Sequence, residues 1–354
     1  MIDWITAELE HATAVKRATG GRGVIRRLTR YEYNNTMRDL LGIELEYAND
    51  LPPETAPLGG FENDGSTMGM SGMQLEYYLK AARMGLDVAL VDGSQPEQFY
   101  HYGTCNVDRR ADRQPEKTHT NKIQPGNAFM TRMMEYPTTG PVTIRVKAHA
   151  VIPDGKGPPR MRVRVGIRAD TYIPGGQIGA DIDILATEES PMVYEFKGQL
   201  ERFEKVLATP SNFPGLMITV QNVYDDGSDK INILDLRLNE QERQLNNPDP
   251  CQPWIVVEFV EFVAPDYAVW PPEHHTRILF KGLEVPADES DYAEKVLGRF
   301  LRRAYRRPAT VEEIQEPLKF FNEIRGEYNS FTGAIKEALA MALISPQFLY
   351  MVVP

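Results

Sequence analysis

The sequence lacks an excess of positive charge, and this limits the partners that the protein can have. Its 354 residues include 39 Lys and Arg against 50 Asp and Glu, which gives a formal net charge of −11. Acidic residues outnumber basic ones in each of the segments 1–98, 99–285 and 286–354. Because nucleic-acid binding requires a basic face that neutralises phosphates, we expect no nucleic-acid partner.

Long hydrophobic runs are also absent. No stretch approaches the ~18 consecutive apolar residues that a membrane-spanning helix needs, so we expect no membrane span. The first residues lack the charged and apolar regions of a signal peptide. The pattern of residues 1–9 instead predicts a helix with Asp3 as its N-cap.

Cysteine is scarce, with only Cys105 and Cys251 in the whole chain. The haem-attachment motif Cys-x-x-Cys-His is therefore absent, and we expect no haem bound to this chain. The two cysteines lie near opposite ends of a long β-rich segment. They either form a disulfide, which an extracytoplasmic compartment would permit, or remain two separate thiols.

The first 98 residues have the pattern of helices. Thr29 and Glu32 have the spacing of a capping box, and Gly42 follows a run of apolar residues at helical spacing. Ser71 and Gln74 predict the start of another helix. We therefore expect residues 1–98 to be helical.

In the middle of the chain, the apolar residues recur with a period of two, which is typical of β-strands. Apolar and polar residues alternate over 142–148, 161–167 and 192–197, and further apolar runs occupy 216–220, 231–238 and 254–263. Turn residues rather than helices separate these runs, which indicates antiparallel strands. We predict a β-sandwich, jelly-roll-like in architecture, over residues 99–280.

The last segment, 281–354, returns to the helical pattern, with one amphipathic helix near 297–305, a second capped by Thr310 and Glu313, and a third near 331–343. The apolar run 348–353 is expected to be exposed. Each helical segment has apolar faces too small for a core of its own. The predicted fold is therefore α+β and multidomain, with the sandwich inserted between two helical segments that pack together.

Three stretches carry a resemblance to a known family: Arg-Leu-Thr-Arg-Tyr-Glu-Tyr-Asn-Asn-Thr-Met-Arg-Asp-Leu-Leu-Gly at 27–42, the sequence of 270–279, and that of 300–310. The chain resembles the planctomycete-specific modular proteins of unknown function. The resemblance implies a carbohydrate-binding-like β-sandwich, an extracytoplasmic location and a cytochrome c domain upstream, whose last helix would be residues 1–20. It also implies that the last helical domain is truncated at its C-terminal end.

An acidic loop follows one of the predicted strands. Asp225, Asp226 and Asp229 supply hard oxygen ligands of the kind that calcium binds. Residues 222–239 also loosely resemble a calcium-dependent xylan-binding pattern. The alternative is a polar hairpin turn, because Asp and Gly are favoured there in any case.

Other polar clusters have structural explanations. His274 and His275 are adjacent, so on a strand they would point in opposite directions, and we expect no zinc site. The pattern of arginines at 299–307 predicts a solvated helix face. The alternative is a binding surface for an anionic partner. Further charges predict buried ion pairs that join the two helical segments; they are Arg27, Arg30, Glu32, Arg38 and Asp39.

Two classes of function remain open. In the first, the chain is non-catalytic: the sandwich binds polysaccharide while the helical segments scaffold it near an electron-transfer domain. In the second, it is a fragment of a redox-coupled enzyme that acts on polysaccharide, with its active site in the helical domains and in a C-terminal part expected to be missing here. Aromatic rings stack on sugars and carboxylates bind their hydroxyls. The expected carbohydrate site therefore combines six residues: Tyr224, Asp225, Asp226, Asp229, Tyr267 and Trp270.

Overall fold

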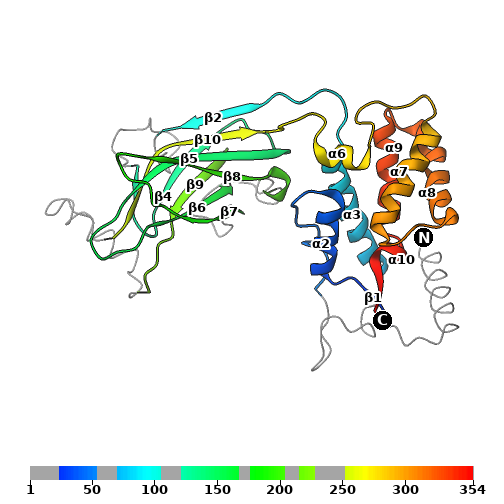
Figure 1. The fold of residues 1–354 in the computed structure, drawn as a ribbon, viewed down its shortest axis with the longest axis horizontal. Coiled ribbons are helices and arrows are strands. Elements are labelled where there is room, and N and C mark those ends of the chain that lie inside the picture. Colours follow the sequence, from blue (N-terminus) through cyan, green and yellow to red (C-terminus); the bar gives the residue numbers. More distant parts are fainter. Residues whose placement is uncertain are drawn as a thin grey trace. The chain divides into compact units, whose positions relative to one another are not determined.

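A computed structural model describes residues 24–53, 70–104, 121–166, 176–203, 215–227 and 252–353 (Figure 1). The chain divides into two compact units. The helical unit holds the described residues up to Gln95 and from Ala268 onward, and the sheet unit holds those between Pro96 and Tyr267. The predicted α+β fold, with antiparallel sheets between helical segments, is confirmed. The helix expected in residues 1–20, the strand expected at 231–238 and both cysteines lie outside the described residues.

The helical unit is built from helices whose ends the sequence marks clearly. Capping boxes begin α2 at Thr29, α3 at Ser71 and α8 at Thr310, and Gly42 ends α2 in the left-handed conformation with φ 76°. Both features satisfy backbone groups that a helix end leaves open. The described helices are Arg30–Leu41 (α2), Gly72–Ala89 (α3), Glu273–Ile278 (α6), Glu289–Ala304 (α7), Val311–Ile324 (α8), Phe331–Leu343 (α9) and Pro346–Leu349 (α10).

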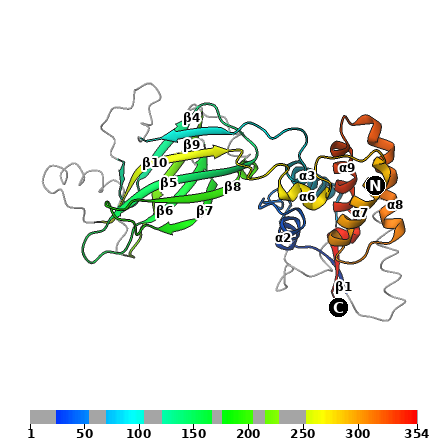
Figure 2. The ribbon, with the colours of Figure 1, turned by 45° about the horizontal axis from the view of Figure 1, so that its top comes forward.

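Helices from both ends of the sequence share one hydrophobic core. Buried side chains of α2 and α3 cluster with those of α7 and α9, and α7, α8 and α9 lie side by side in both views (Figures 1 and 2). Polar contacts join α3 to α9 as well: Arg83 pairs with Glu337 at 2.6 Å and Asp87 with Lys336 at 3.2 Å. The two helical segments therefore pack together as the sequence predicts.

The two ends of the described chain form a small antiparallel ribbon. Val24–Arg27 (β1) pairs with Tyr350–Val353 (β11), with Arg27 opposite Tyr350. Just before β11, Phe348 and Leu349 are almost fully buried. The apolar run at 348–353 was expected to be exposed, and this expectation was wrong for Phe348 and Leu349. Its first residues complete the helical core, and its backbone finds hydrogen-bond partners in β1.

The sheet unit consists of two antiparallel sheets. One has the strand order β2-β10-β5-β8, with β3 also paired to β10, and the other has the order β4-β9-β6-β7. The strands are Phe99–Gly103 (β2), Lys122–Ile123 (β3), Ala128–Met133 (β4), Pro141–Val151 (β5), Arg160–Gly166 (β6), Gly176–Asp183 (β7), Met192–Gln199 (β8), Leu216–Asn222 (β9) and Trp254–Ala264 (β10).

The buried side chains of these sheets form one hydrophobic core. The alternating apolar residues of β5 point inward, and Ile144 and Val146 cluster with Phe262 of β10 and Val163 of β6. Arg145 and its polar neighbours therefore face outward, because successive side chains of a strand point to opposite faces.

The sheet unit ends earlier than the sequence analysis placed it. Residues 268–280 belong to the helical unit, where Ile278 and Leu279 are buried in the helical core. The predicted boundary at residue 280 therefore falls inside the helical unit.

Candidate functional site

The acidic loop after β9 has the contacts of a turn in its described part. The Asp225 carboxylate accepts the Gly227 N–H at 2.9 Å, and Asp226 pairs with Lys156 at 2.7 Å. Tyr224 accepts the Gly157 N–H at 3.3 Å. Asp229 lies outside the described residues, and among those that are described no three His, Cys, Asp or Glu side chains converge. Calcium at Asp225, Asp226 and Asp229 thus stays a prediction.

Two further residues, Tyr267 and Trp270, were expected at this site. Tyr267 is half-buried beside Gly140, just before the start of β5, whereas Tyr224 contacts Gly157, beyond its end. With 11 residues in β5, roughly 35 Å of strand separates them at ~3.3 Å per residue. Trp270 belongs to the helical unit, where its indole N–H donates to the Gly93 carbonyl at 2.9 Å. The structure therefore separates Tyr224 from Tyr267, and the six-residue carbohydrate site stays a prediction.

The outer face of the five-stranded sheet presents a different set of side chains. Tyr100 and Tyr102 of β2 are 56% and 47% exposed. The strand register places Tyr102 beside Glu261, Glu261 beside Arg145, and Arg145 beside Glu195. These residues form what we call the tyrosine face: Tyr100, Tyr102, Arg145, Glu195, Phe259 and Glu261.

Hydrogen bonds hold the polar members of the tyrosine face in place. Arg145 donates to Glu195 at 2.9 Å and to Glu261 at 3.2 Å. The Tyr100 hydroxyl donates to Glu261 at 2.8 Å, and this bond raises the pKa of Tyr100. Hydrogen bonds from Lys197 and Arg145 lower the pKa of Glu195. The lowered pKa keeps the Glu195 carboxylate ionised at neutral pH.

The aromatic side chains of the tyrosine face are also held in place. The Tyr102 ring lies against Phe259 with ring centroids 5.0 Å apart and planes tilted by 33°. A ring fixed by a neighbour loses less freedom when a ligand stacks on it. This face is not among the sites predicted from the sequence. Its signal was the alternation of aromatic residues in Phe-Tyr-His-Tyr-Gly at the start of the β-rich segment.

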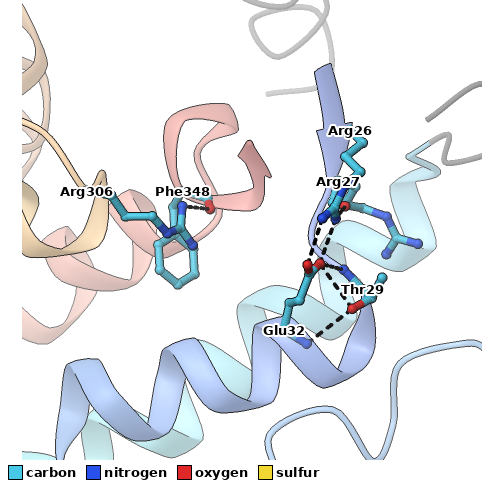
Figure 3. Close-up of polar contacts among 6 residues, drawn as sticks. All are labelled: Arg26, Arg27, Thr29, Glu32, Arg306 and Phe348. Atoms are coloured by element: carbon cyan, nitrogen blue, oxygen red, sulfur yellow. Dashed lines mark hydrogen bonds and ion pairs between the residues drawn. The ribbon is translucent and has the colours of Figure 1, made fainter. Parts of the chain in front are cut away.

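A second polar cluster occupies the start of α2 (Figure 3). Arg26 forms two hydrogen bonds of 2.7 Å with the Glu32 carboxylate, which also accepts the Thr29 N–H at 2.9 Å. Arg27 points away from Glu32 and donates to the Tyr78 hydroxyl. The partner of Glu32 is thus Arg26, and not one of the arginines the sequence analysis named.

The other expected charges of the helical unit bind locally or to backbone. Arg38 pairs with Glu46, and Arg303 donates to the Asp39 carbonyl at 3.0 Å. A cation at that place opposes the partial negative charge of the α2 C-terminus. Arg306 donates to the Phe348 carbonyl at 3.3 Å (Figure 3). These contacts give the charged side chains of the helical unit a structural role.

Replacing Glu32 by glutamine should remove a pH-dependent part of the stability. The bonds from Arg26 lower the pKa of Glu32 from 4.5 to about 2. Stabilisation is therefore present above pH 4.5 and is lost as the pH falls towards about 2. After allowance for partial exposure it amounts to about 1–2 kcal/mol. Urea unfolding at neutral and acidic pH should show this loss in the unmodified chain. E32Q should lack it, whereas E76Q, at an exposed position of α3, should retain it.

The adjacent histidines hold α6 in place. The Nδ1 atom of His275 accepts the Val91 N–H at 3.1 Å and its Nε2–H donates to the Gly282 carbonyl at 3.1 Å. His274 contacts the Ala89 carbonyl through Nδ1 at 2.9 Å. Both ring nitrogens of His275 are thus in use, so it has none left to bind a metal.

Comparisons with known proteins find family matches only in the helical unit. Residues 26–91 match PSD3, described as a protein of unknown function (DUF1587), and residues 292–352 match PSD5, described as a protein of unknown function (DUF1595). Two such domains are consistent with planctomycete-specific modular proteins. No curated protein matches.

Among solved structures, the chain is similar to Arthrobacter globiformis T6 isomalto-dextranase complexed with panose. The two are 15% identical, the match covers 40% of this chain and 17% of that chain, and the TM-score is 0.21. Within the described residues, no helix combines the length and the hydropathy required to cross a membrane.

Proposed function

We propose that the chain is the polysaccharide-binding part of an extracytoplasmic modular protein. The sheet unit would bind a glycan on the tyrosine face, while the helical unit scaffolds it near an electron-transfer domain such as cytochrome c. The observation that carries this proposal is the exposed pair Tyr100 and Tyr102 beside the Glu261–Arg145–Glu195 row. Tyrosine rings can cover the apolar C–H face of a sugar while charged groups bind its hydroxyls.

The described part of the helical unit favours this function over a redox-coupled enzyme. Its polar groups with shifted pKa values, such as Glu32 and His275, are engaged in helix capping and backbone contacts. A catalytic acid or base instead needs access to a substrate. The helical unit therefore supports scaffolding.

Removing both tyrosine rings should abolish most of the glycan binding. In affinity electrophoresis through gels containing xylan or soluble cellulose derivatives, the unmodified chain should be retarded. The variant Y100A/Y102A should lose at least about tenfold in affinity, because each stacked ring contributes on the order of 1 kcal/mol. Y31A, at an exposed tyrosine of the helical unit, should behave like the unmodified chain. Free migration of the unmodified chain in every gel would contradict the proposal.

A further inference from the structure

We propose, as a consequence of the proposed function, that the glycan is a neutral, extended polysaccharide that crosses the strands of the five-stranded sheet along the tyrosine face. Three observations carry this inference: the register of four strands, the pairing of the charges on them, and the position of the aromatic rings at one edge.

The register sets the direction of the bound chain. Tyr102, Glu261, Arg145 and Glu195 come from β2, β10, β5 and β8, which are successive strands of the sheet. Neighbouring strands are ~4.8 Å apart, which is close to the length of one pyranose unit in an extended glycan. We call Tyr102, Glu261, Arg145 and Glu195 the row. A polysaccharide that lies across the strands therefore meets a new side chain of the row at each sugar. About four sugar units would span the row.

The charges on the row favour a neutral ligand over an acidic one. Two carboxylates, Glu195 and Glu261, flank the single guanidinium of Arg145, and Lys197 pairs with Glu195 at 2.8 Å. The two negative and two positive charges cancel. A uronic acid or sulfate would meet carboxylates on both sides of Arg145, and like charges that face each other reduce affinity. Neutral hydroxyls, which both donate and accept hydrogen bonds, find partners of both kinds.

The aromatic rings define one end of the path. Among the described strands, β2 lies at one edge of the sheet, and its side chains Tyr100 and Tyr102 are exposed. Two residues apart on one strand, they lie on the same face, roughly 7 Å apart along it. We infer that the first sugar stacks on Tyr102 while the following sugars lie over Glu261, Arg145 and Glu195.

Calorimetric titration of the complete chain tests this inference. The ligands are neutral xylo- and cello-oligosaccharides of about two to six units and oligogalacturonates of matched length. Affinity should rise with length up to about four units and then level off. The neutral hexamers should bind at least about tenfold more tightly than hexagalacturonate, at low and at high salt. The double variant E195Q/E261Q frees Arg145 and Lys197, so it should shift the neutral-to-acidic affinity ratio towards the acid by at least about tenfold. Circular dichroism of this variant shows whether its fold is intact.

The outcomes separate this inference from the proposed function. Equal or tighter binding of hexagalacturonate by the unmodified chain would overturn the neutral-ligand inference while polysaccharide binding stands. A plateau already at two units would overturn the path across four strands. Absence of heat with every oligosaccharide would overturn the proposed function, and this inference with it.

Discussion

Replacing Phe348 by alanine should destabilise the helical unit by about 3–5 kcal/mol. The Phe348 side chain is fully buried, although it lies only six residues from the end of the sequence. Its ring packs edge-on against Tyr33 with centroids 6.1 Å apart, and the Arg306 guanidinium lies over it at 5.7 Å. The substitution therefore leaves a cavity between segments from the two ends of the sequence. Chemical unfolding followed by far-UV circular dichroism measures the loss.

The matched control for this variant is V311A. Val311 begins α8 in the same unit and is 68% exposed, so its truncation should change the free energy of unfolding by less than about 0.5 kcal/mol. A loss below about 1 kcal/mol for F348A would show that the last residues do not belong to the helical core.

Replacing His275 by alanine should cost about 3–5 kcal/mol, because it creates a cavity and leaves two partly buried backbone groups without their side-chain partner. The Val91 N–H and the Gly282 carbonyl both bond to this imidazole, which is fully buried. Thermal unfolding of H275A measures the loss. H274A is the matched control, since His274 contacts a single backbone carbonyl and is less buried. Its cost should be about 1 kcal/mol.

His275 should also make stability depend on pH. Burial lowers the pKa of His275 below its ordinary value of 6.5, because the charged imidazolium would lose its hydration. Protonation of Nδ1 would also place a second N–H against the Val91 N–H. The unfolded chain therefore takes up this proton more readily than the folded one. Stability is complete above about pH 6.5 and falls as the pH drops below that value towards the folded pKa. The pH profile of H275A should be flatter than that of the unmodified chain. Identical profiles would contradict this role.

The helix starts and the strand periods could be predicted because they depend on residues close together in sequence. The capping boxes at Thr29, Ser71 and Thr310 involve residues three apart, and the structure confirms each of them. The alternation in β5 likewise assigns Ile144 and Val146 to the core without knowledge of the partner strand.

The tyrosine face could not be predicted in this way. It depends on the pairing of β2 with β10, which sets Tyr102 opposite Glu261 although 159 residues separate them. A shift of one residue in register would reverse the faces. Trp270 follows the last described strand of the sheet unit in sequence, but its indole N–H donates to a backbone carbonyl of the helical unit.

The location of the binding site is the central claim, and one comparison tests it most directly. Calorimetry with xylohexaose should be performed on Y102A and on Y224A, which remove one tyrosine each from the two candidate sites of the sheet unit. We predict that Y102A loses about tenfold or more in affinity while Y224A binds like the unmodified chain. Loss of affinity in Y224A with unchanged binding by Y102A would place the glycan on the acidic loop and contradict the account.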